Sequence, residues 1–330
     1  MTKNKTRKNN KKIIPFKKKK NVRFSKKVGK KDLFKKKVIT VSLGVAIFLA
    51  GLGGVEATIS YIDEKKQEKI EMQKLAEAKR LEEERRKKEE EEAKKRMVGV
   101  NHEAKKYTYD AKIVEQKLKN YDYSNNGEKV VFLTFDDGSS TTVTPQILDI
   151  LKQYDVRATF FVAGQNIENG GQKAKDLIKQ SFEYGNAIAN HSYSHDYKYL
   201  YPGRSLNLEN FINDFKKNEE LLKEILGPYF STRVIRCPGG SMSWKDMDPL
   251  YEKLDESNSA DINWNALSGD AEGGKKTADE LVQRAIKTSE GKEMVVLLMH
   301  DTYGKEETAK ALPRIIEYFK DNGYTFKTLS

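Results

Sequence analysis

The sequence predicts an α/β domain over residues 128–330, built as a closed or nearly closed (β/α) barrel of about seven parallel strands. Short apolar runs alternate with amphipathic stretches throughout this region, a pattern that favours parallel strands joined by crossover helices. Seven strands in about 200 residues fit a barrel better than an open doubly wound sheet. A charge-free run and a long run of mixed charge come before the domain, and they predict a transmembrane helix and a charged helical stalk. The expected organisation is a basic cytoplasmic tail (1–37), a transmembrane signal-anchor (38–60), the stalk (61–97), a linker (98–127) and the domain (128–330).

The charge of the chain is strongly polarised. Its 330 residues include 61 Lys and Arg against 49 Asp and Glu, a formal net charge of +12. Residues 1–37 contain 18 of the basic residues and one acid, Asp32, so this tail carries +17 and the remaining chain carries −5 of the total. Because the positive charge lies in a tail, a basic nucleic-acid-binding core is excluded and no nucleic-acid partner is expected. The single cysteine, Cys237, excludes an intrachain disulfide framework and a Cys-rich zinc module.

The segment Val38–Val55 contains no charged residue. As a helix it would extend roughly 27 Å, close to the ~30 Å hydrocarbon core of a bilayer. The basic run 35–37 lies directly before it, so the positive-inside rule keeps the N-terminus cytoplasmic and places the C-terminal domain outside. The alternatives are a buried core helix and a signal peptide cleaved near 55–57, which would release the domain. We expect a single-pass membrane protein anchored through residues 38–60.

The segment Asp63–Arg96 contains 12 acidic and 13 basic residues, and neither Pro nor Gly interrupts it. Glu and Lys at i,i+4 spacing support a solvated single helix. The few apolar residues do not sustain a heptad repeat, so the pattern assigns no oligomeric state. The alternative is a flexible charged linker, and either form would act as a spacer. The sequence Asn125-Asn126-Gly127 then marks a turn before the domain.

The strands of the domain are expected where apolar runs are bounded by turn residues. Such runs are short, as in buried parallel strands. The expected strands are Val130–Phe135, Ala158–Val162, Ala187–Ala189, Arg233–Ile235, Asp261–Trp264, Met294–Met299 and Tyr324–Thr328.

The helices between them carry recognisable start signals. Thr144 followed by Pro145 predicts an N-cap with proline at the first helical position, opening a helix over Gln146–Tyr154. Thr277 and Glu280 form the pattern of a capping box. The other expected helices are one running from this box to near Gly291, and the amphipathic stretches Leu206–Leu226 and Lys310–Asp321.

Polar residues follow the ends of five predicted strands. Asp136-Asp137-Gly138 follows the first strand, His191-Ser-Tyr-Ser-His195 the third and Arg236-Cys-Pro-Gly-Gly240 the fourth. Asp270 comes shortly after the fifth strand, and His300-Asp301 closes the sixth. In a parallel barrel these strand ends meet at one face. Three of the four histidines of the chain fall there, which indicates an active site.

The histidines and the aspartates suggest a metal site. Two imidazoles and one carboxylate are a frequent ligand set for a catalytic zinc-type ion, which keeps one position open for water. His191 and His195 are four residues apart, so one helical turn would aim both at the same point. Asp136 and Asp137 on an extended segment would point in opposite directions, so that one could bind metal and the other act as a base. The alternative is that Asp136-Asp137-Gly138 is only a turn.

His300 at a strand end has two interpretations. It could be a core histidine with satisfied hydrogen bonds. A carboxylate partner such as Asp270 would instead raise its pKa and keep it protonated as a general acid.

The order of these motifs resembles the polysaccharide deacetylases, the metal-dependent carbohydrate esterase family 4 with its NodB-homology domain. The matching motifs are Thr134-Phe-Asp-Asp137, His191-Ser-x-x-His195, Arg236-x-Pro238, Asp270 and Leu298-Met-His300. The family includes chitin deacetylases and the peptidoglycan N-acetylglucosamine deacetylases of Gram-positive bacteria. The resemblance covers roughly residues 128–330 and implies a distorted (β/α) barrel.

The resemblance also implies a role for each motif residue and a bound divalent ion, Zn²⁺ first, with Co²⁺ or another transition metal as alternatives. Asp136 would be the general base, held by Arg236, and His300 the general acid, tuned by Asp270. The remaining expected roles are metal binding by Asp137, His191 and His195, and substrate binding by Gly239 (an oxyanion-hole N–H), Leu298 (the acetyl-methyl pocket) and Trp264.

Two motifs depart from the family pattern. Cys237 stands where the first of two prolines usually follows the arginine. The fourth motif, usually Asp-x-x-Asp-Trp, reads Leu267-Ser-Gly-Asp270-Ala271 here, so it keeps only the second acid and lacks the tryptophan of one pocket wall. A variant in Gram-positive peptidoglycan deacetylases is similar to Trp264-Asn-Ala-Leu267, so activity is still expected.

The expected function is metal-dependent hydrolysis of N-acetyl groups from an aminosugar polymer, with release of acetate. Peptidoglycan is the expected polymer because the anchor and spacer face outward. The alternatives are an O-acetyl xylan esterase, a chitin-oligomer deacetylase, and a catalytically inactive wall-binding module.

Overall fold

The computed structural model describes residues 53–330, which divide into two units between Leu81 and Glu82. Residues 38–52 of the expected anchor lie outside the described residues. Helix α2 (Gly53–Lys95) covers the expected stalk and carries i,i+4 ion pairs such as Glu83–Lys87 at 3.0 Å. Within residues 53–330, no helix is both long enough and apolar enough to cross a membrane.

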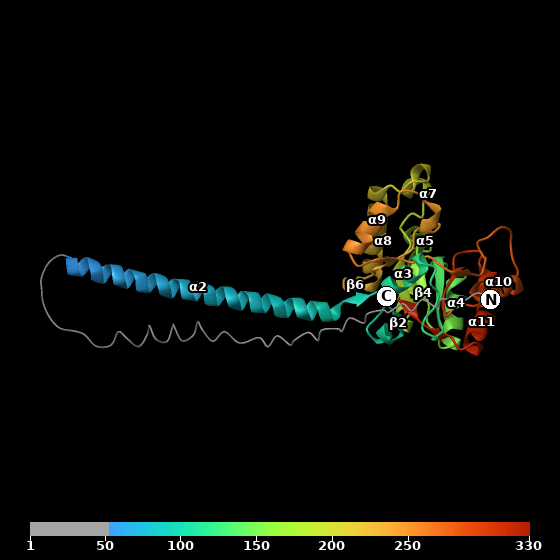
Figure 1. Ribbon diagram of the computed structural model, residues 1–330, viewed down its shortest axis with the longest axis horizontal. Helices are drawn as coiled ribbons and strands as arrows, with labels where there is room; N and C mark the ends of the chain where they lie inside the picture. Colours follow the sequence, from blue (N-terminus) through green and yellow to red (C-terminus); the bar gives the residue numbers. More distant parts are fainter. Residues whose placement is uncertain (1–52) are drawn as a thin grey trace, which may run out of the picture. The chain divides into compact units, whose positions relative to one another are not determined.

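The domain is built on one main parallel sheet (Figure 1), whose strands follow the order β8-β7-β5-β4-β3-β10-β9, with β11 pairing Val130 and Val131 at the start of β3. The two long central strands are apolar and almost completely buried, as expected for a sheet covered on both faces. The strands are β3 (Val130–Gly138), β4 (Thr159–Val162), β5 (Ala187–Asn190), β7 (Val234–Ile235), β8 (Ala260–Asp261), β9 (Ala266–Leu267), β10 (Met294–His300) and β11 (Thr325–Phe326).

The sheet curls into a half-barrel that stays open between β8 and β9, its two end strands. The expected fifth strand, Asp261–Trp264, is therefore wrong as one element: the chain leaves β8 there and forms β9 only afterwards. The cause is Asn265, whose side-chain amide donates to Met294 O and accepts from Val296 N, both at 2.8 Å. This amide occupies the backbone groups of β10 with which a continuous strand would have paired.

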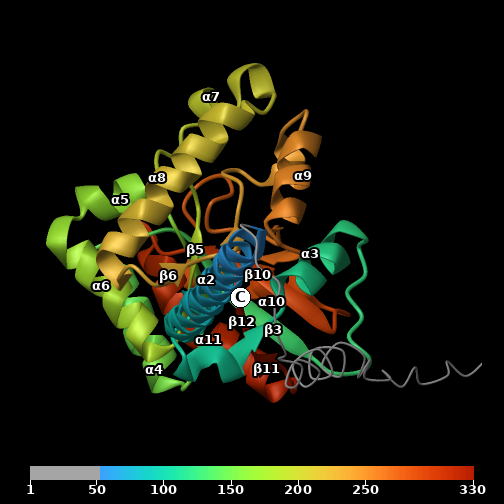
Figure 2. The same cartoon turned by 90° about the vertical axis from the view of Figure 1, so that its left-hand side faces the viewer.

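Helices cover the sheet, and α4, α6 and α8 follow one another around it (Figure 2). Their buried faces are aliphatic and aromatic and join the strands in one main core. The helices of the domain are α3 (Ala111–Lys119), α4 (Thr144–Gln153), α5 (Gly164–Asn169), α6 (Gly171–Tyr184), α7 (Tyr197–Leu200), α8 (Leu208–Leu226), α9 (Asp248–Glu256), α10 (Ala278–Ser289) and α11 (Glu306–Asp321), with short 3₁₀ turns at Glu103–Tyr107, Pro202–Arg204 and Ser241–Ser243.

The two expected helix starts have different outcomes. The capping box of α10 is confirmed, since Thr277 Oγ1 accepts from Glu280 N while the Glu280 carboxylate accepts from Thr277 N. The N-cap expected at Thr144 is wrong, because Thr144 is already the first residue of α4. Ser140 Oγ accepts from the backbone N–H groups at this helix start, while the Thr144 hydroxyl donates to the Asp301 carboxylate at 2.6 Å.

Residues 98–127, expected as a linker, pack into the domain. Strand β1 (Met97–Val98) pairs with β6 (Phe230–Ser231), and β2 (Thr108–Tyr109) pairs with β12 (Thr328–Leu329), close to the C-terminus. Helix α3 buries its apolar face against β8, and its Glu115 carboxylate accepts from the backbone N–H of Asp261. Residues 98–127 thus contribute buried side chains and hydrogen bonds to the domain and do not form a separate spacer.

Candidate active site

The first aspartate motif lies at the carboxyl end of β3, where the strand has a bulge. The register with β4 shifts between Asp136 and Gly138, and Asp137 adopts a left-handed backbone with φ of 66°. The bulge turns both carboxylates into one cavity, so the expectation that they point in opposite directions is wrong. Gly138 is required here because a Cβ would collide with the carboxylate of Asp301.

The two histidines come from a loop between β5 and α7. The expectation of a helical turn is wrong, because Ser192 and His195 have positive φ values of 70° and 52°. Ser192 Oγ accepts from His195 N at 3.0 Å, and the buried Asp214 of α8 accepts from two further N–H groups of the loop at 2.9 and 3.0 Å. These bonds hold a strained backbone that brings both imidazoles to one point.

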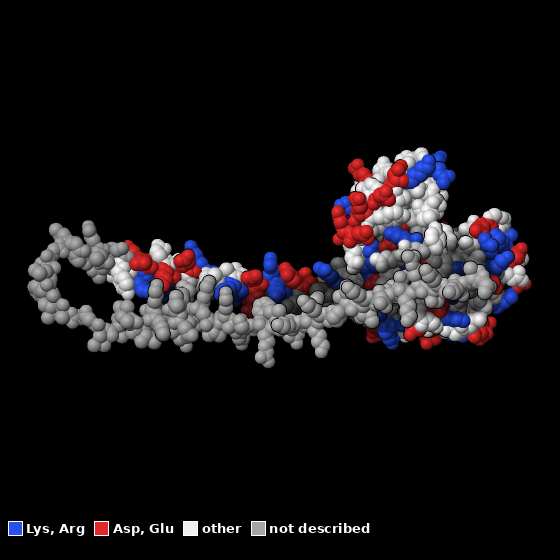
Figure 3. Space-filling view, viewed as in Figure 1, with Lys and Arg blue, Asp and Glu red and all other residues white. Residues whose placement is uncertain are grey.

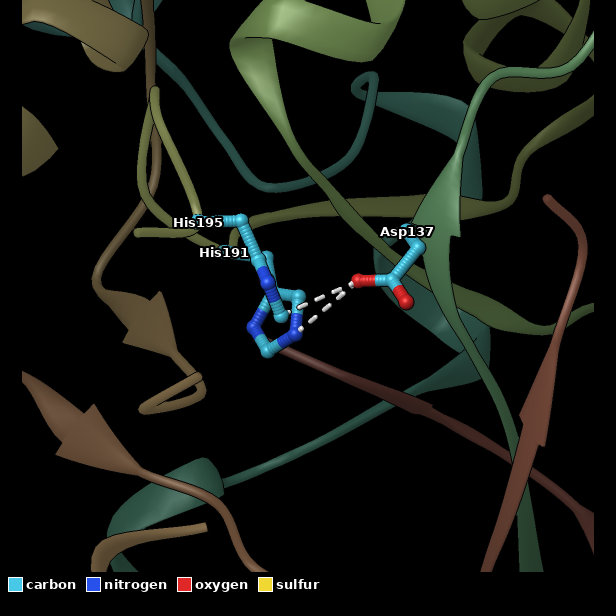
Figure 4. Close-up of side chains that lie close together, drawn as sticks. All are labelled: Asp137, His191 and His195. Carbon is cyan, nitrogen blue, oxygen red and sulfur yellow. Dashed lines mark ion pairs between the residues drawn. The ribbon is translucent and has the colours of Figure 1, made fainter. Parts of the chain in front are cut away.

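Asp137, His191 and His195 converge as a possible ligand set (Figure 4). Asp137 Oδ1 lies 3.4 Å from His191 Nε2 and 3.3 Å from His195 Nε2. This oxygen is buried and has no hydrogen-bond partner, a costly state that a cation would relieve.

The environment of His191 suits metal binding. Its Nδ1 lies 2.8 Å from the carbonyl oxygen of Arg236, so Nδ1 donates and the lone pair of Nε2 faces Asp137. Burial lowers the pKa of His191 to about 3, which keeps the imidazole neutral as a ligand must be. The donor set therefore fits one divalent ion of the zinc type.

Asp136 is held by a buried arginine. Arg236, which is fully buried, donates to Asp136 Oδ1 at 2.5 Å, to Thr134 Oγ1 at 3.0 Å and to Ile262 O at 2.7 Å. Burial raises the pKa of Asp136, and the Arg236 charge opposes that rise. With Oδ1 bound, Oδ2 stays free and lies 3.7 Å from His191 Nε2, beside the ligand set.

His300 faces the same cavity from β10, where it lies opposite Asp136 in the strand register. Its Nδ1 lies 2.9 Å from Asp270 Oδ1, and its backbone N donates to Oδ2 at 2.8 Å. Thr308 of α11 also donates to Oδ2 at 2.8 Å and fixes this carboxylate. Burial disfavours the imidazolium, but the hydrogen bond and charge of Asp270 outweigh it and raise the pKa of His300 to about 9.

These groups line one cavity of about 330 Å³ at the carboxyl ends of the strands. The structure places every residue expected at the site in its wall, except Arg236, which lies behind Asp136. Leu267 and Ala271, where the fourth motif departs from the family, also line the wall, so leucine, alanine and neighbouring side chains replace the missing tryptophan.

Sequence reasoning missed five lining residues, which are Tyr197, Gly240, Gly269, Glu272 and Lys305. A Cβ on Gly240 would lie 2.8 Å from the ring of Trp264. Tyr197 could have been found, because it follows His195 by two residues. Glu272 and Lys305 lie in loops without a periodic pattern, so no signal marked them.

The cysteine departure has a structural role. The backbone N–H of Cys237 donates to the buried carboxylate of Asp261 at 3.1 Å, a bond that proline could not make. The thiol is fully buried, which raises its pKa well above the usual value and makes it unreactive.

Comparison with known proteins agrees with this geometry. The polysaccharide deacetylase family profile matches residues 123–254. A CE4 esterase structure from Streptococcus mutans is 36% identical, with a TM-score of 0.65, covering 71% of this chain and 96% of that one. A peptidoglycan-N-acetylglucosamine deacetylase of Bacillus cereus is 31% identical over 207 residues, 62% of this chain and 88% of the relative. A bifunctional xylanase/deacetylase of Pseudobutyrivibrio xylanivorans is 30% identical over 210 residues, 63% of this chain and 31% of the relative. The chain belongs to the polysaccharide deacetylase family.

Proposed function

We propose that this protein removes N-acetyl groups from the N-acetylglucosamine residues of peptidoglycan and releases acetate. The observation that carries the proposal is the convergence of a free carboxylate, a three-residue ligand set and a protonated histidine in one cavity. The likeness to a Bacillus cereus protein named as a peptidoglycan-N-acetylglucosamine deacetylase supports the choice of polymer.

Asp137, His191 and His195 would hold one divalent ion, with Zn²⁺ as the proposed species. Such an ion, when bound, supplies a Lewis acid that acidifies water and polarises the acetamide carbonyl. The rest of the chemistry belongs to side chains and backbone of this chain.

Asp136 acts as the general base through Oδ2, because Arg236 occupies Oδ1 and fixes the carboxylate. It removes a proton from the water that attacks the acetamide carbon. The N–H of Gly239 donates to the oxyanion that forms on the substrate. His300 then transfers its proton to the leaving amine, and Asp270 stabilises the charged imidazole before transfer.

The apolar wall of the cavity selects the acyl group. Leu298 and Leu267 are paired in register on adjacent strands and both line the cavity. Two leucines beside the carbonyl position provide an apolar surface for the acetyl methyl group, while Trp264 lines the wall for the sugar ring.

Deacetylation of xylan is the second candidate, because the chain also resembles the bifunctional xylanase/deacetylase. Acetate release from purified peptidoglycan, from N-acetylglucosamine oligomers and from acetylated xylan separates the possibilities. We expect acetate from peptidoglycan at the highest kcat/KM. Release from acetylated xylan alone would establish an esterase, and release from none would indicate an inactive wall-binding module.

We also propose, from the sequence, that residues 38–60 anchor the protein in the cell membrane with the domain outside, where peptidoglycan lies. Fractionation of cells should then place the full chain with the membranes, and external protease on wall-less cells should remove the domain. A domain found free in the medium, beginning near residue 57, would instead establish secretion after signal cleavage.

A further inference from the structure

A second groove, of about 460 Å³, lies beside the catalytic cavity. Tyr197 lines both, so the groove adjoins the catalytic cavity. Its floor is aromatic, with Tyr201 and Trp244, and its rim includes Lys198 and Arg204.

The aromatic rings are fixed in place. Trp244 stacks on the buried ring of Tyr201 with centroids 4.2 Å apart and planes 8° apart, and its indole N–H donates to Pro238 O at 2.8 Å. The Tyr197 ring lies 5.2 Å from both Trp244 and the His195 imidazole. Tyr197 nevertheless stays 44% exposed, although a large aromatic ring gains by burial.

The rings also reach the oxyanion position. A Cβ on Gly239 would lie 3.1 Å from Trp244 and 3.4 Å from Tyr197, so both rings lie against this glycine. A ligand on these rings would therefore directly adjoin the reacting acetamide.

The rim of the groove is positively charged. Lys198 and Arg204 are exposed, and among the described residues neither forms a salt bridge. The Arg204 guanidinium donates to Ser243 O at 2.9 Å, which holds it at the groove. Figure 3 shows basic side chains at the end of the domain where Figure 1 labels α7.

We propose that this groove binds the sugar adjacent to the reacting N-acetylglucosamine, and that Lys198 and Arg204 favour a neighbour that carries a carboxylate. The inference rests on the proposed function and deepens it. The C–H face of a sugar ring packs on Trp244 and Tyr197, while a carboxylate substituent meets the two cations. In peptidoglycan strands from which the stem peptides have been removed, every second sugar carries a free carboxyl group, whereas chitin oligomers carry none.

The test compares KM and kcat on glycan fragments of equal length, one set from peptidoglycan with free carboxylates and one of neutral N-acetylglucosamine oligomers. In Lys198→Gln/Arg204→Gln, we expect KM to rise about fivefold on the anionic fragments and to stay within about twofold on the neutral ones. Trp244→Ala should raise KM about tenfold on both sets. Trp244→Phe, which keeps an aromatic ring, should recover most of this loss.

Two matched controls accompany these variants. Tyr199→Ala removes a tyrosine of the same short helix that is 42% exposed and lines neither cavity, and Lys216→Gln removes an exposed charge on α8. Both should behave as the wild type on all fragments.

Equal KM changes on anionic and neutral fragments in the Lys198/Arg204 variant would overturn the charge selection. A Trp244→Ala variant with wild-type KM on both sets would overturn the groove as a sugar site. Calorimetric binding of the same fragments keeps both statements testable if the wild type releases no acetate, an outcome that would overturn the proposed function instead.

Discussion

Asp136 and Asp137 are chemically identical neighbours that the bulge of β3 places in different surroundings. Asp136 is bound to Arg236, and Asp137 faces the two histidines. We predict that Asp137→Asn weakens metal binding, because an amide is a poorer ligand than a carboxylate, and that excess metal partly restores its activity. Asp136→Asn should bind metal normally yet lose about 10²–10⁴ in kcat, because it lacks the proton acceptor. Metal titration of acetate release measures both.

If excess metal restored the activity of Asp136→Asn and not that of Asp137→Asn, Asp136 would be the metal ligand and Asp137 the general base. Metal content of the purified variants serves as the control, because it separates loss of the ion from loss of the base.

The pKa of His300 predicts the basic limb of the pH profile. Asp270 raises this pKa from 6.5 to about 9, so the acid is protonated below pH 9 and activity should fall as pH rises through that value. The same shift stabilises the folded state fully below pH 6.5, and this contribution is lost as pH rises through 9. Asp270→Asn removes the negative charge that raises the pKa of His300 against the effect of burial. The basic limb of the pH profile of kcat should therefore move well below pH 9. An unchanged limb would show that another group sets it.

The motif residues could be predicted because parallel strands bring their carboxyl ends to one face, which depends only on strand order in the chain. Glu272 and Lys305 could not, since loop conformation places them and loops carry no periodicity. The convergence of the Asp136 and Asp137 carboxylates on one cavity could not be predicted from the sequence either. It depends on the bulge, and no residue pattern marked that bulge.

At the scale of elements, the loop between β5 and α7 depends on one carboxylate of α8. Asp214 accepts from two backbone N–H groups of that loop. We predict that Asp214→Ala lowers stability by about 1–3 kcal/mol, because it leaves these donors unpaired, and weakens metal affinity because the histidines lose their fixed positions. Thermal unfolding and a metal-competition titration measure the two effects.

Asp214→Asn keeps one acceptor oxygen and should fall between the wild type and Asp214→Ala in both measurements. Wild-type metal affinity in Asp214→Ala would show that the loop is held by other contacts.

Most strands of the main sheet and several helices followed the sequence, including the short strands β4, β5, β7 and β11, whereas the 14-residue helix α6 and five two-residue strands were not expected. Strands β3 and β10 and helices α8, α10 and α11 carry clear apolar periodicity or caps, so their positions were expected to within a few residues, except that α11 begins four residues early, at Glu306. Strands β1, β2, β6, β9 and β12 have two residues each, too few for any period, and they form only because the tertiary structure supplies partners. For the same reason the half-barrel opening at Asn265 was not foreseen.

At the scale of the whole molecule, residues 97–127 complete the catalytic domain. Ala111 and Val114 of α3 are fully buried in the core that contains β3 and β10. We predict that a chain beginning at residue 97 unfolds cooperatively near the temperature of the full-length protein. A chain beginning at residue 128 should unfold at a much lower temperature, because each lost large aliphatic core side chain costs about 1.5–3 kcal/mol.

Calorimetry of the two truncated chains measures this difference. Equal unfolding temperatures would show that residues 98–127 are a linker, as the sequence predicted.

We propose that one ion held by Asp137, His191 and His195 supports deacetylation by Asp136 and His300. The most direct measurement is acetate release from peptidoglycan as a function of metal bound per chain, in the chelated wild type and in His191→Ala and His195→Ala. We predict no acetate release from the chelated protein and a linear rise to a plateau at one ion per chain. The two folded variants should show neither bound metal nor activity at limiting metal. Acetate release from the chelated wild type, or near-normal activity of either variant at limiting metal, would contradict this proposal.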